Sequence, residues 1–159
     1  LYCHFARANR QWQTIEKQAI LTVFSGPHAY ISPTWYQNGP NVPTWNYAAV
    51  HATGSAMLLD ESDTLSLVED SVRHHEPALF EKGEVFSAEH NARLVKAIVG
   101  CKITITSIEG KLKLGQNRSE ADRHGIRRGL QQTNGFEALS LGAFMDKLYG
   151  NQETMSRAV

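Results

Sequence analysis

The sequence is poor in cysteine and has no long apolar run. Cys3 and Cys101 are its only cysteines, and they show no CxxC spacing, which argues against a disulfide framework and a structural zinc site. Its longest apolar stretches, Ala19–Phe24 and Tyr47–Leu59, are too short or too polar to span a bilayer. No secretory signal pattern opens the sequence. These features predict a protein of the reducing cytoplasm that does not contact a membrane.

Several motifs of common enzyme classes are also missing. The sequence contains no GxGxxG, GxxxxGK[ST], HExxH or GxSxG. It therefore lacks the signature motifs of dinucleotide-binding folds, P-loop proteins, zinc proteases and serine hydrolases. The densest histidine cluster is His74-His75-Glu76. Adjacent side chains on a helix point about 100° apart, so these two histidines cannot easily share one ion. We therefore expect a solvated helix end there and no metal site.

Charge is balanced in sum but segregated along the chain. Sixteen basic and sixteen acidic residues give a net charge of zero, which excludes a polybasic nucleic-acid coat. Gln18–Leu59 has no charged residue but holds four of the five prolines and two of the three tryptophans. Asp60–Glu89 holds nine acids against two bases, and Lys111–Arg128 holds six bases against two acids. The charge-free window suits the wall of a pocket, and the basic stretch suits contacts to an anion.

The residue pattern predicts strands in the first third and again near 100–114, with helices between them. Strands are expected at Leu1–Ala8, Ala19–Ser25, His28–Ser32 and Trp45–Leu59, and at 100–110 with a hairpin turn at Glu109-Gly110 and a return strand Lys111–Leu114. Helices are expected after the N-caps Asp60 or Ser62, Ser87 and Ser119 (a capping box with Asp122), and over Phe136–Tyr149. Gly54 is expected to mark a bulge or a close approach within its strand. The fold class is mainly β with peripheral helices (α+β), an antiparallel barrel or sheet, in one domain over 1–150 with a frayed tail over 151–159.

The first chemical constellation is His4-Phe5-Ala6-Arg7-Ala8-Asn9. On a strand, Arg7 and Asn9 share one face near the strand end, where they suit an anion or a phosphate. The alternative is an edge strand with ordinary polar residues.

The second and third constellations, 26–36 and 42–51, interleave aromatic rings with hydroxyl and amide groups and carry no formal charge. This composition suits a planar ligand held between ring faces and hydrogen-bonding groups. The alternative is a proline-stiffened loop that packs Trp35 and Trp45 into the core. That alternative leaves Thr44 and Asn46 in need of partners.

The fourth constellation, 112–123, runs from a strand into the start of a helix. Lys113, Arg118 and the free N–H groups of the first helical turn make an anion site. The alternative is a capped helix with a solvated basic face.

Together these stretches resemble the PaiB-type FMN-binding negative transcriptional regulators. The strings that carry the resemblance are HFARANRQW (4–12), GPHAYISPTWY (26–36), VPTWNYAAVHATG (42–54), IVGCKITITSIEGKLKLGQNRSEADR (98–123) and the following Gly129-Leu130. The family is similar to the split-barrel flavin proteins. The resemblance implies a six-stranded Greek-key split barrel of the FMN-binding type, usually a homodimer with FMN at the subunit interface.

Site residues follow from the resemblance, motif by motif. It implies phosphate or ribityl contacts from His4, Arg7 and Asn9, and further contacts from Ser32, Thr44, Asn46 and Tyr47. Trp35 and Trp45 would wall the ring system. Lys113, Gln116, Asn117 and Arg118 would reach the flavin, which could be that of the partner subunit.

The sequence departs from the family pattern in three places. Arg10 stands where the family usually has Pro, and Gly115 stands where it usually has Ser, which removes a hydroxyl from the fourth motif. Family members also carry an opening strand hairpin before the first motif, whereas this sequence begins inside that pattern. Either the sequence is truncated or incomplete, or the barrel lacks that hairpin, in which case strand edges are exposed.

The sequence is consistent with three hypotheses about function. The resemblance implies a flavin-binding regulator, with weak DNA contacts from Arg118, Arg123, Arg127 and Arg128. A flavin-dependent oxidoreductase of small molecules is the second reading, in which the cofactor supplies the chemistry. The third is a haem-binding or haem-degrading relative with His4, His28 or His51 as an axial ligand. The sequence alone does not say whether the protein is an enzyme.

Overall fold

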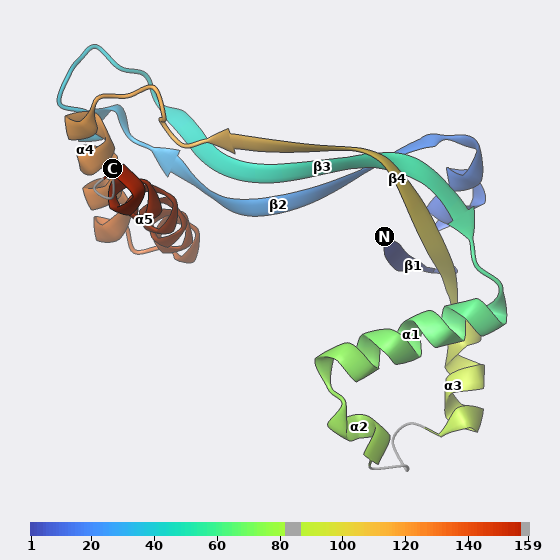
Figure 1. Cartoon of the computed structure of the whole chain (residues 1–159). Coiled ribbons are helices and arrows are strands. Elements are labelled where there is room, and N and C mark those ends of the chain that lie inside the picture. The colour runs from blue at the N-terminus through green and yellow to red at the C-terminus, as the bar shows by residue number, and fades with distance from the viewer. Residues whose placement is uncertain (82–86, 157–159) are drawn as a thin grey trace. The chain divides into compact units, whose positions relative to one another are not determined.

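The structure is a computed structural model that describes residues 1–81 and 87–156 (Figure 1). Its strands are β1 Tyr2–Ala6, β2 Ala19–Ile31, β3 Thr44–Leu58 and β4 Ile98–Lys113. Its helices are α1 Glu61–His75, α2 Ala78–Glu81, α3 Ala88–Leu94, α4 Glu120–Gln132 and α5 Phe136–Ser156. Short 3₁₀ turns occupy Arg10–Gln13, Ile15–Lys17, Pro33–Trp35 and Val95–Ala97.

The four strands form one sheet in the order β1-β4-β3-β2. β2, β3 and β4 follow one another in the chain, and β1 pairs antiparallel with β4, which is a Greek-key arrangement. An antiparallel sheet with helices confirms the predicted α+β class. The resemblance implies six strands, whereas the described residues contain four.

Two predicted strand breaks are wrong. β2 runs without interruption through Gly26 and Pro27, where the sequence predicts two short strands. β2 is an edge strand, and a proline that lacks an N–H is tolerated at an edge. β4 likewise continues through Glu109 and Gly110 to Lys113, so the predicted hairpin turn is absent there. Continued pairing in the sheet outweighs the local turn preference at both places.

The helix starts agree with the sequence. Asp60, Ser87 and Ser119 each cap a helix, and the side-chain oxygen of each accepts a backbone N–H from the first turn. Such a cap satisfies one of the free donors at a helix start, which is why local residue types predict it. The short helix α2 is not predicted, and α5 continues to Ser156, beyond the predicted end at Tyr149.

Contacts between residues divide the chain into two compact units. Unit 1 comprises Leu1–Thr22 and Ala52–Ile108, and unit 2 comprises Val23–His51 and Glu109–Val159. β2, β3 and β4 each contribute one part to unit 1 and the other to unit 2.

Unit 1 has a small core around Ile15, Ala56, Cys101 and Ile103. α1 is fixed to β4 there, because the Gly100 N–H donates a 3.1 Å hydrogen bond to the buried hydroxyl of Thr64. The predicted close approach at Gly54 is confirmed, since a side chain at this position would overlap the Thr104 carbonyl of β4.

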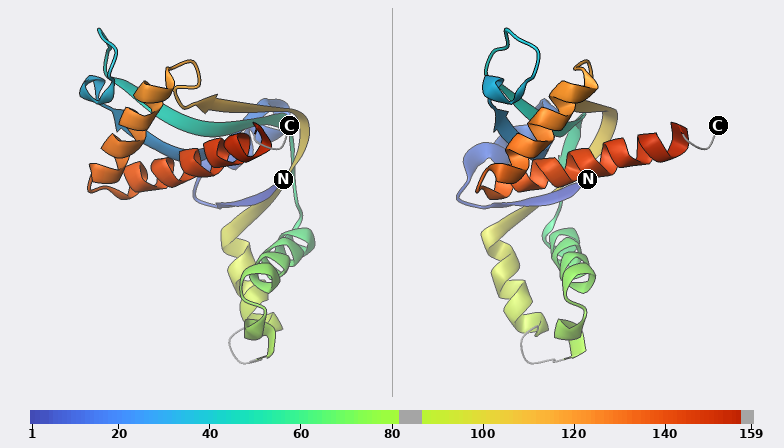
Figure 2. Two further views of the ribbon diagram at one scale, coloured as in Figure 1. Left: turned by 60° about the vertical axis from the view of Figure 1, so that its left-hand side comes forward. Right: turned by 90° about the vertical axis from the view of Figure 1, so that its left-hand side faces the viewer.

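Unit 2 has the larger core. Its fully buried side chains come from β2, from the residue that follows β4 and from both helices: Ile31, Leu114, Ile126, Leu130, Leu141 and Met145. α4 and α5 lie side by side (Figure 2), and an ion pair between Arg127 and Asp146 joins them. These helices cover the face of β2 that carries Ala29 and Ile31.

Candidate functional site

The start of β3 and the end of β4 bring together three polar side chains of unit 2. Lys113 Nζ donates a 2.7 Å hydrogen bond to Thr44 Oγ1. Side chains alternate along a strand, so Thr44 and Asn46 lie on the same face of β3. An ammonium, a hydroxyl and an amide therefore share one side of the sheet.

Asn46 is the most informative member of this set. Its side chain is 2% exposed, and its Nδ2 has no hydrogen-bond partner among the described residues. Leaving a buried donor unsatisfied costs about 1–3 kcal/mol, so native proteins rarely do it without a ligand or a water at the site. The amide is therefore a donor that suits an acceptor supplied from outside the chain.

Trp45 lies on the opposite face of β3 and is 54% exposed. Its ring contacts two aromatic neighbours on β2: His28 at 6.1 Å and Tyr30 at 6.4 Å between ring centroids. Cavities of about 340 and 320 Å³ adjoin these rings, and both are lined by His28 and Trp45. Tyr47 lines the second cavity. An exposed aromatic surface of this kind offers ring faces to a planar ligand.

The two tryptophans have different environments. Trp35 follows Ser32 in a 3₁₀ turn, and its indole packs against Gly129 of α4 so closely that a side chain at 129 would overlap it. Ser32 caps that turn, with its Oγ 2.8 Å from Thr34 Oγ1. The core-packing alternative therefore describes Trp35 well, although Trp35 also lines the 340 Å³ cavity. The same alternative does not describe Trp45, which is exposed.

The segment between β4 and α4 is held by its own side chains. Gln116 bonds to the backbone on both sides, with Nε2 donating to the Leu112 carbonyl at 2.7 Å and Oε1 accepting from the Leu114 N–H at 2.8 Å. Gly115 has φ +74°, a conformation that favours glycine, which gives a reason for glycine in place of the family's serine. Arg118 donates to Asn41 Oδ1 at 2.9 Å and lies 4.9 Å from the ring of Tyr36, while Asn117 is exposed.

Asp122 is a residue of this region that the sequence marks only as a helix cap. Its buried carboxylate accepts the backbone N–H groups of Gln37 at 2.8 Å and Asn38 at 3.1 Å. Burial acts to raise the pKa of Asp122, but the hydrogen bonds from Asn38, Ser119 and Gln37 outweigh it and hold the pKa below its usual value. Asp122 thereby anchors the loop that leads into Thr44.

His4, Arg7 and Asn9 lie in unit 1. The Arg7 guanidinium donates to two backbone carbonyls, those of Lys96 at 2.7 Å and Ile98 at 3.0 Å. Asn9 caps the following turn by accepting the Gln11 N–H at 3.0 Å. His4 is exposed. Arg7 is thus bonded to a distant segment of the chain and Asn9 to its own turn, and the contacts of both residues to a ligand stay a prediction.

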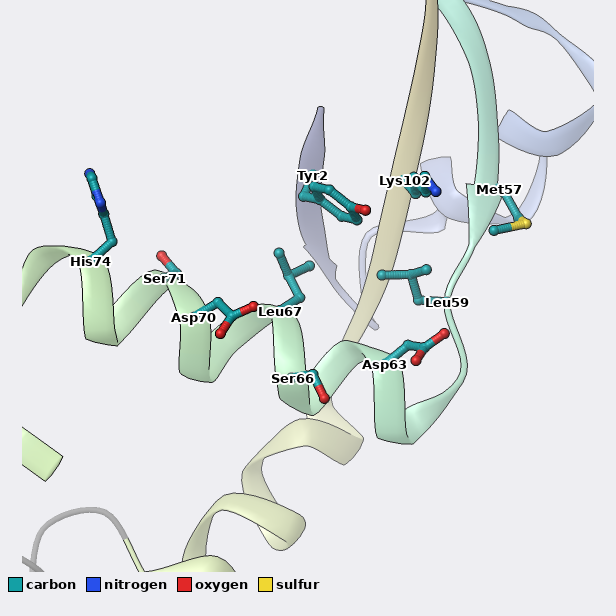
Figure 3. Close-up of a pocket in the computed structure, with 10 residues that line it drawn as sticks. All are labelled: Tyr2, Met57, Leu59, Asp63, Ser66, Leu67, Asp70, Ser71, His74 and Lys102. Atoms are coloured by element: carbon teal, nitrogen blue, oxygen red, sulfur yellow. The ribbon is translucent and has the colours of Figure 1, made fainter.

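Unit 1 also contains a cavity of about 770 Å³ beside α1 (Figure 3). Leu67 of α1 points toward Leu59 and Tyr2, and Lys102 Nζ lies 6.0 Å from the centroid of the Tyr2 ring. None of the residues that the sequence predicts to contact a ligand lines this cavity.

Metal-ligating side chains do not gather in groups of three or more anywhere in the described ranges 1–81 and 87–156. Of the candidate axial histidines, His4 belongs to unit 1, and His28 and His51 belong to unit 2. Among the described helices, none combines the length and the apolar composition needed to cross a bilayer.

Comparison with known proteins places these features in a family. A family model described as "Putative FMN-binding domain" matches residues 1–107. "Protease synthase and sporulation protein PAI 2" of Bacillus subtilis is 39% identical over 152 residues, a match that covers 91% of this chain and 72% of that protein. An uncharacterised protein of Aspergillus fumigatus is 33% identical over 150 residues, covering 79% of this chain and 58% of the relative.

A solved structure supports the fold. The flavocytochrome Anf3 of Azotobacter vinelandii superimposes with a TM-score of 0.51 at 19% identity, covering 77% of this chain and 55% of that one. The chain thus spans little more than half of two of these three proteins. At this identity the likeness bears on the fold alone, and it supports the predicted α+β split barrel. The family match over 1–107 and the B. subtilis relative together show that this chain belongs to the PaiB-type family of FMN-binding proteins.

Proposed function

We propose that unit 2 binds FMN around the start of β3, with Thr44, Asn46 and Lys113 as its polar contacts. The observation that carries this proposal is the buried Asn46 amide, whose Nδ2 has no partner among the described residues. The Lys113 ammonium and the Thr44 hydroxyl lie at the same end of the strand. An amide donor, a hydroxyl and a cation are the groups that a ligand with carbonyl oxygens, hydroxyls and a phosphate requires.

The residues present fit FMN in their chemistry. Lys113 and Arg118 would hold the phosphate, Thr44 the ribityl hydroxyls, and Asn46 an acceptor atom of the ring system. Trp45, with Tyr47 beside it, would contact the ring face. Gln116, Asn117, Ser32 and Trp35 would shape the site from its border. When bound, FMN supplies one- or two-electron redox chemistry, and the chain's residues bind and orient it.

The contacts that the family resemblance implies for His4, Arg7 and Asn9 of unit 1 are proposed separately from the unit 2 site. Two Arg7 nitrogens already donate to backbone carbonyls, which leaves its Nη1 for a phosphate oxygen. Both bonds fix the direction of the guanidinium and so lower the entropy that it would lose on binding.

A homodimer would resolve a conflict within unit 2. Thr44 and Asn46 lie on one face of β3, whereas Trp45 lies on the other, so one planar ligand cannot readily contact both sets from the same strand. If FMN lies at a subunit interface, one subunit supplies the polar face and its partner supplies the aromatic face. The alternation along β3 thus supports a homodimer with two shared flavin sites.

Mixed dimers test this arrangement. Asn46→Leu and Trp45→Ala subunits would be co-expressed with different tags and purified as the mixed species. Shared sites predict that each variant alone binds FMN only weakly while the mixed dimer binds one FMN with unaltered affinity, because one of its sites combines an intact polar face with an intact aromatic face. Mixed dimers that bind no FMN would show that both faces of a site come from the same subunit.

The cofactor itself is tested by titration. Adding the purified apo protein to micromolar FMN should quench the flavin fluorescence to saturation. Unchanged fluorescence over this range contradicts the proposal. A separate measurement of NADH consumption with added FMN distinguishes a regulator from a flavin-dependent oxidoreductase.

Transcriptional repression in the cytoplasm is the biological role that we propose for this FMN-binding chain, in line with its family. Three of the four arginines in and before α4 already make contacts within the chain, which leaves few of them to contact DNA. Arg118 bonds to Asn41, Arg123 lies 5.4 Å from the ring of Tyr149, and Arg127 pairs with Asp146. Arg128 is exposed, so its substitution provides the test. If α4 binds DNA, Arg128→Ala should weaken gel-shift binding and reduce the salt dependence of that binding.

A further inference from the structure

Cys3 and Cys101 are the chain's only two cysteines, and they lie directly opposite each other on the neighbouring strands β1 and β4. The backbones of Leu1 and Ile103 exchange two hydrogen bonds of 2.8 Å, which makes 1 and 103 a hydrogen-bonded pair. Such pairs alternate along an antiparallel ladder, so 3 and 101 form the next one. Their side chains therefore project from the same face of the sheet.

The spacing of such a pair suits a covalent bond. Residues of a hydrogen-bonded antiparallel pair have Cα atoms about 5.5 Å apart. Disulfides span Cα separations of roughly 4.4–6.8 Å, with the commonest values near 5.5–6 Å. The two thiols also make a side-chain hydrogen bond to each other, so the sulfur atoms are already in contact. A disulfide needs Cβ atoms roughly 3.5–4.5 Å apart, so a small local adjustment of the two strands completes the geometry.

The two thiols differ in their access to solvent. Cys101 is fully buried, whereas Cys3 is half-buried. Burial, followed by the neighbouring thiol of Cys3 and the charge of Glu16, raises the pKa of Cys101 to about 11. An outside reagent can reach Cys3 but not Cys101, so any exchange reaction has to begin at Cys3.

We propose that Cys3 and Cys101 form a thiol–disulfide exchange site whose substrate is a low-molecular-weight disulfide such as glutathione disulfide. The Cys3 thiolate attacks one sulfur of that disulfide, forms a mixed disulfide and releases one thiolate. Cys101 then loses its proton to solvent and attacks the Cys3 sulfur, while the released thiolate takes up a proton from solvent. This second step forms the Cys3–Cys101 bond and releases the second small thiolate, which takes up the proton that Cys3 lost. Two protein thiols are oxidised, and one small disulfide is reduced to two thiols.

The cross-link would act on an exposed part of the sheet. β1 is an edge strand that pairs only with β4 among the described strands, so a bond to Cys101 would fix it to the sheet. It would also close a chain loop that contains most of unit 1, which restricts the unfolded state. We therefore expect the oxidised form to unfold at a higher temperature than the reduced form.

Incubation of the folded protein with glutathione disulfide, followed by intact-mass measurement, tests the proposal. The unaltered chain should lose the mass of two hydrogen atoms, show no thiol toward iodoacetamide after unfolding, and regain both thiols with dithiothreitol. Cys101→Ser should stop at the mixed disulfide on Cys3 and gain one glutathionyl group. Cys3→Ser should not react while folded.

Two outcomes would overturn the proposal. One is that the unaltered chain keeps both thiols free, and the other is that it accumulates the mixed disulfide at Cys3 without closing the bond. Because both are read from the unaltered chain, they hold even if a serine at the buried position 101 prevents folding. FMN binding does not enter the measurement, so its result is independent of the proposed cofactor function.

Discussion

Lys113 Nζ donates a 2.7 Å hydrogen bond to Thr44 Oγ1 and thereby joins the end of β4 to the start of β3. Both residues lie in motifs that the sequence predicts to contact a phosphate-bearing ligand, and they are 69 positions apart in the chain. The pair places an ammonium on the face of β3 that also carries the buried Asn46. Its chemistry leads to the first prediction.

Lys113→Met should raise the dissociation constant of FMN by about tenfold to a hundredfold, since a hydrogen bond to a charged group contributes about 1.5–3 kcal/mol. The variant should also reduce the dependence of binding on salt. Lys111→Met is the matched control, because Lys111 is exposed and lies two residues earlier on the same face of β4. Fluorescence titrations at several salt concentrations provide the measurement. Equal effects of the two variants would contradict a specific role for Lys113.

Asn46→Leu should separate ligand binding from stability. The change removes a buried donor that has no partner among the described residues and replaces it with an apolar side chain of similar volume. We expect an unchanged or increased free energy of unfolding, together with FMN affinity weakened by about 1–3 kcal/mol. Urea unfolding of the apo protein and flavin titration measure the two quantities. A loss of stability with unaltered FMN affinity would show that Asn46 has a structural role instead.

The parts of the fold that local residue types control were predictable. Asp60, Ser87 and Ser119 start helices because each side chain bonds to a backbone N–H only a few residues away. The unbroken course of β4 through Gly110 was not predictable from local residues, because pairing with distant strands causes it.

The same distinction holds for the site. Sequence motifs place Thr44, Asn46 and Lys113 among the candidates, but they do not show that Trp35 packs on α4. The anchoring of the 37–38 loop by Asp122 joins groups 84 and 85 positions apart, so no local pattern could reveal it.

Gly129→Ala should destabilise unit 2, because the added methyl group would overlap the indole of Trp35. Overpacking of this kind costs about 1–3 kcal/mol. Gly142→Ala in α5 is the control, since its methyl group would meet only Leu130 Cβ at 3.7 Å and alanine favours a helix by up to about 1 kcal/mol. Denaturant unfolding of both variants compares the two positions. A neutral Gly129→Ala would mean that Trp35 can leave α4 and is available to a ligand.

Asp122 should contribute to the pH dependence of folding. Its pKa in the folded chain lies below the usual value because Asn38, Ser119 and Gln37 donate hydrogen bonds that outweigh the effect of burial. The unfolded chain therefore binds more protons at acidic pH, and the stability that Asp122 provides is present above about pH 4 and is lost as the pH falls through its folded-state pKa. Asp122→Asn should be less stable at neutral pH, and its stability should fall less steeply with acid. Glu120→Gln removes a charge from the same turn at an exposed position and serves as the control. Urea midpoints between pH 3 and pH 7 measure both effects, and identical acid slopes for Asp122→Asn and the unaltered chain would contradict this role.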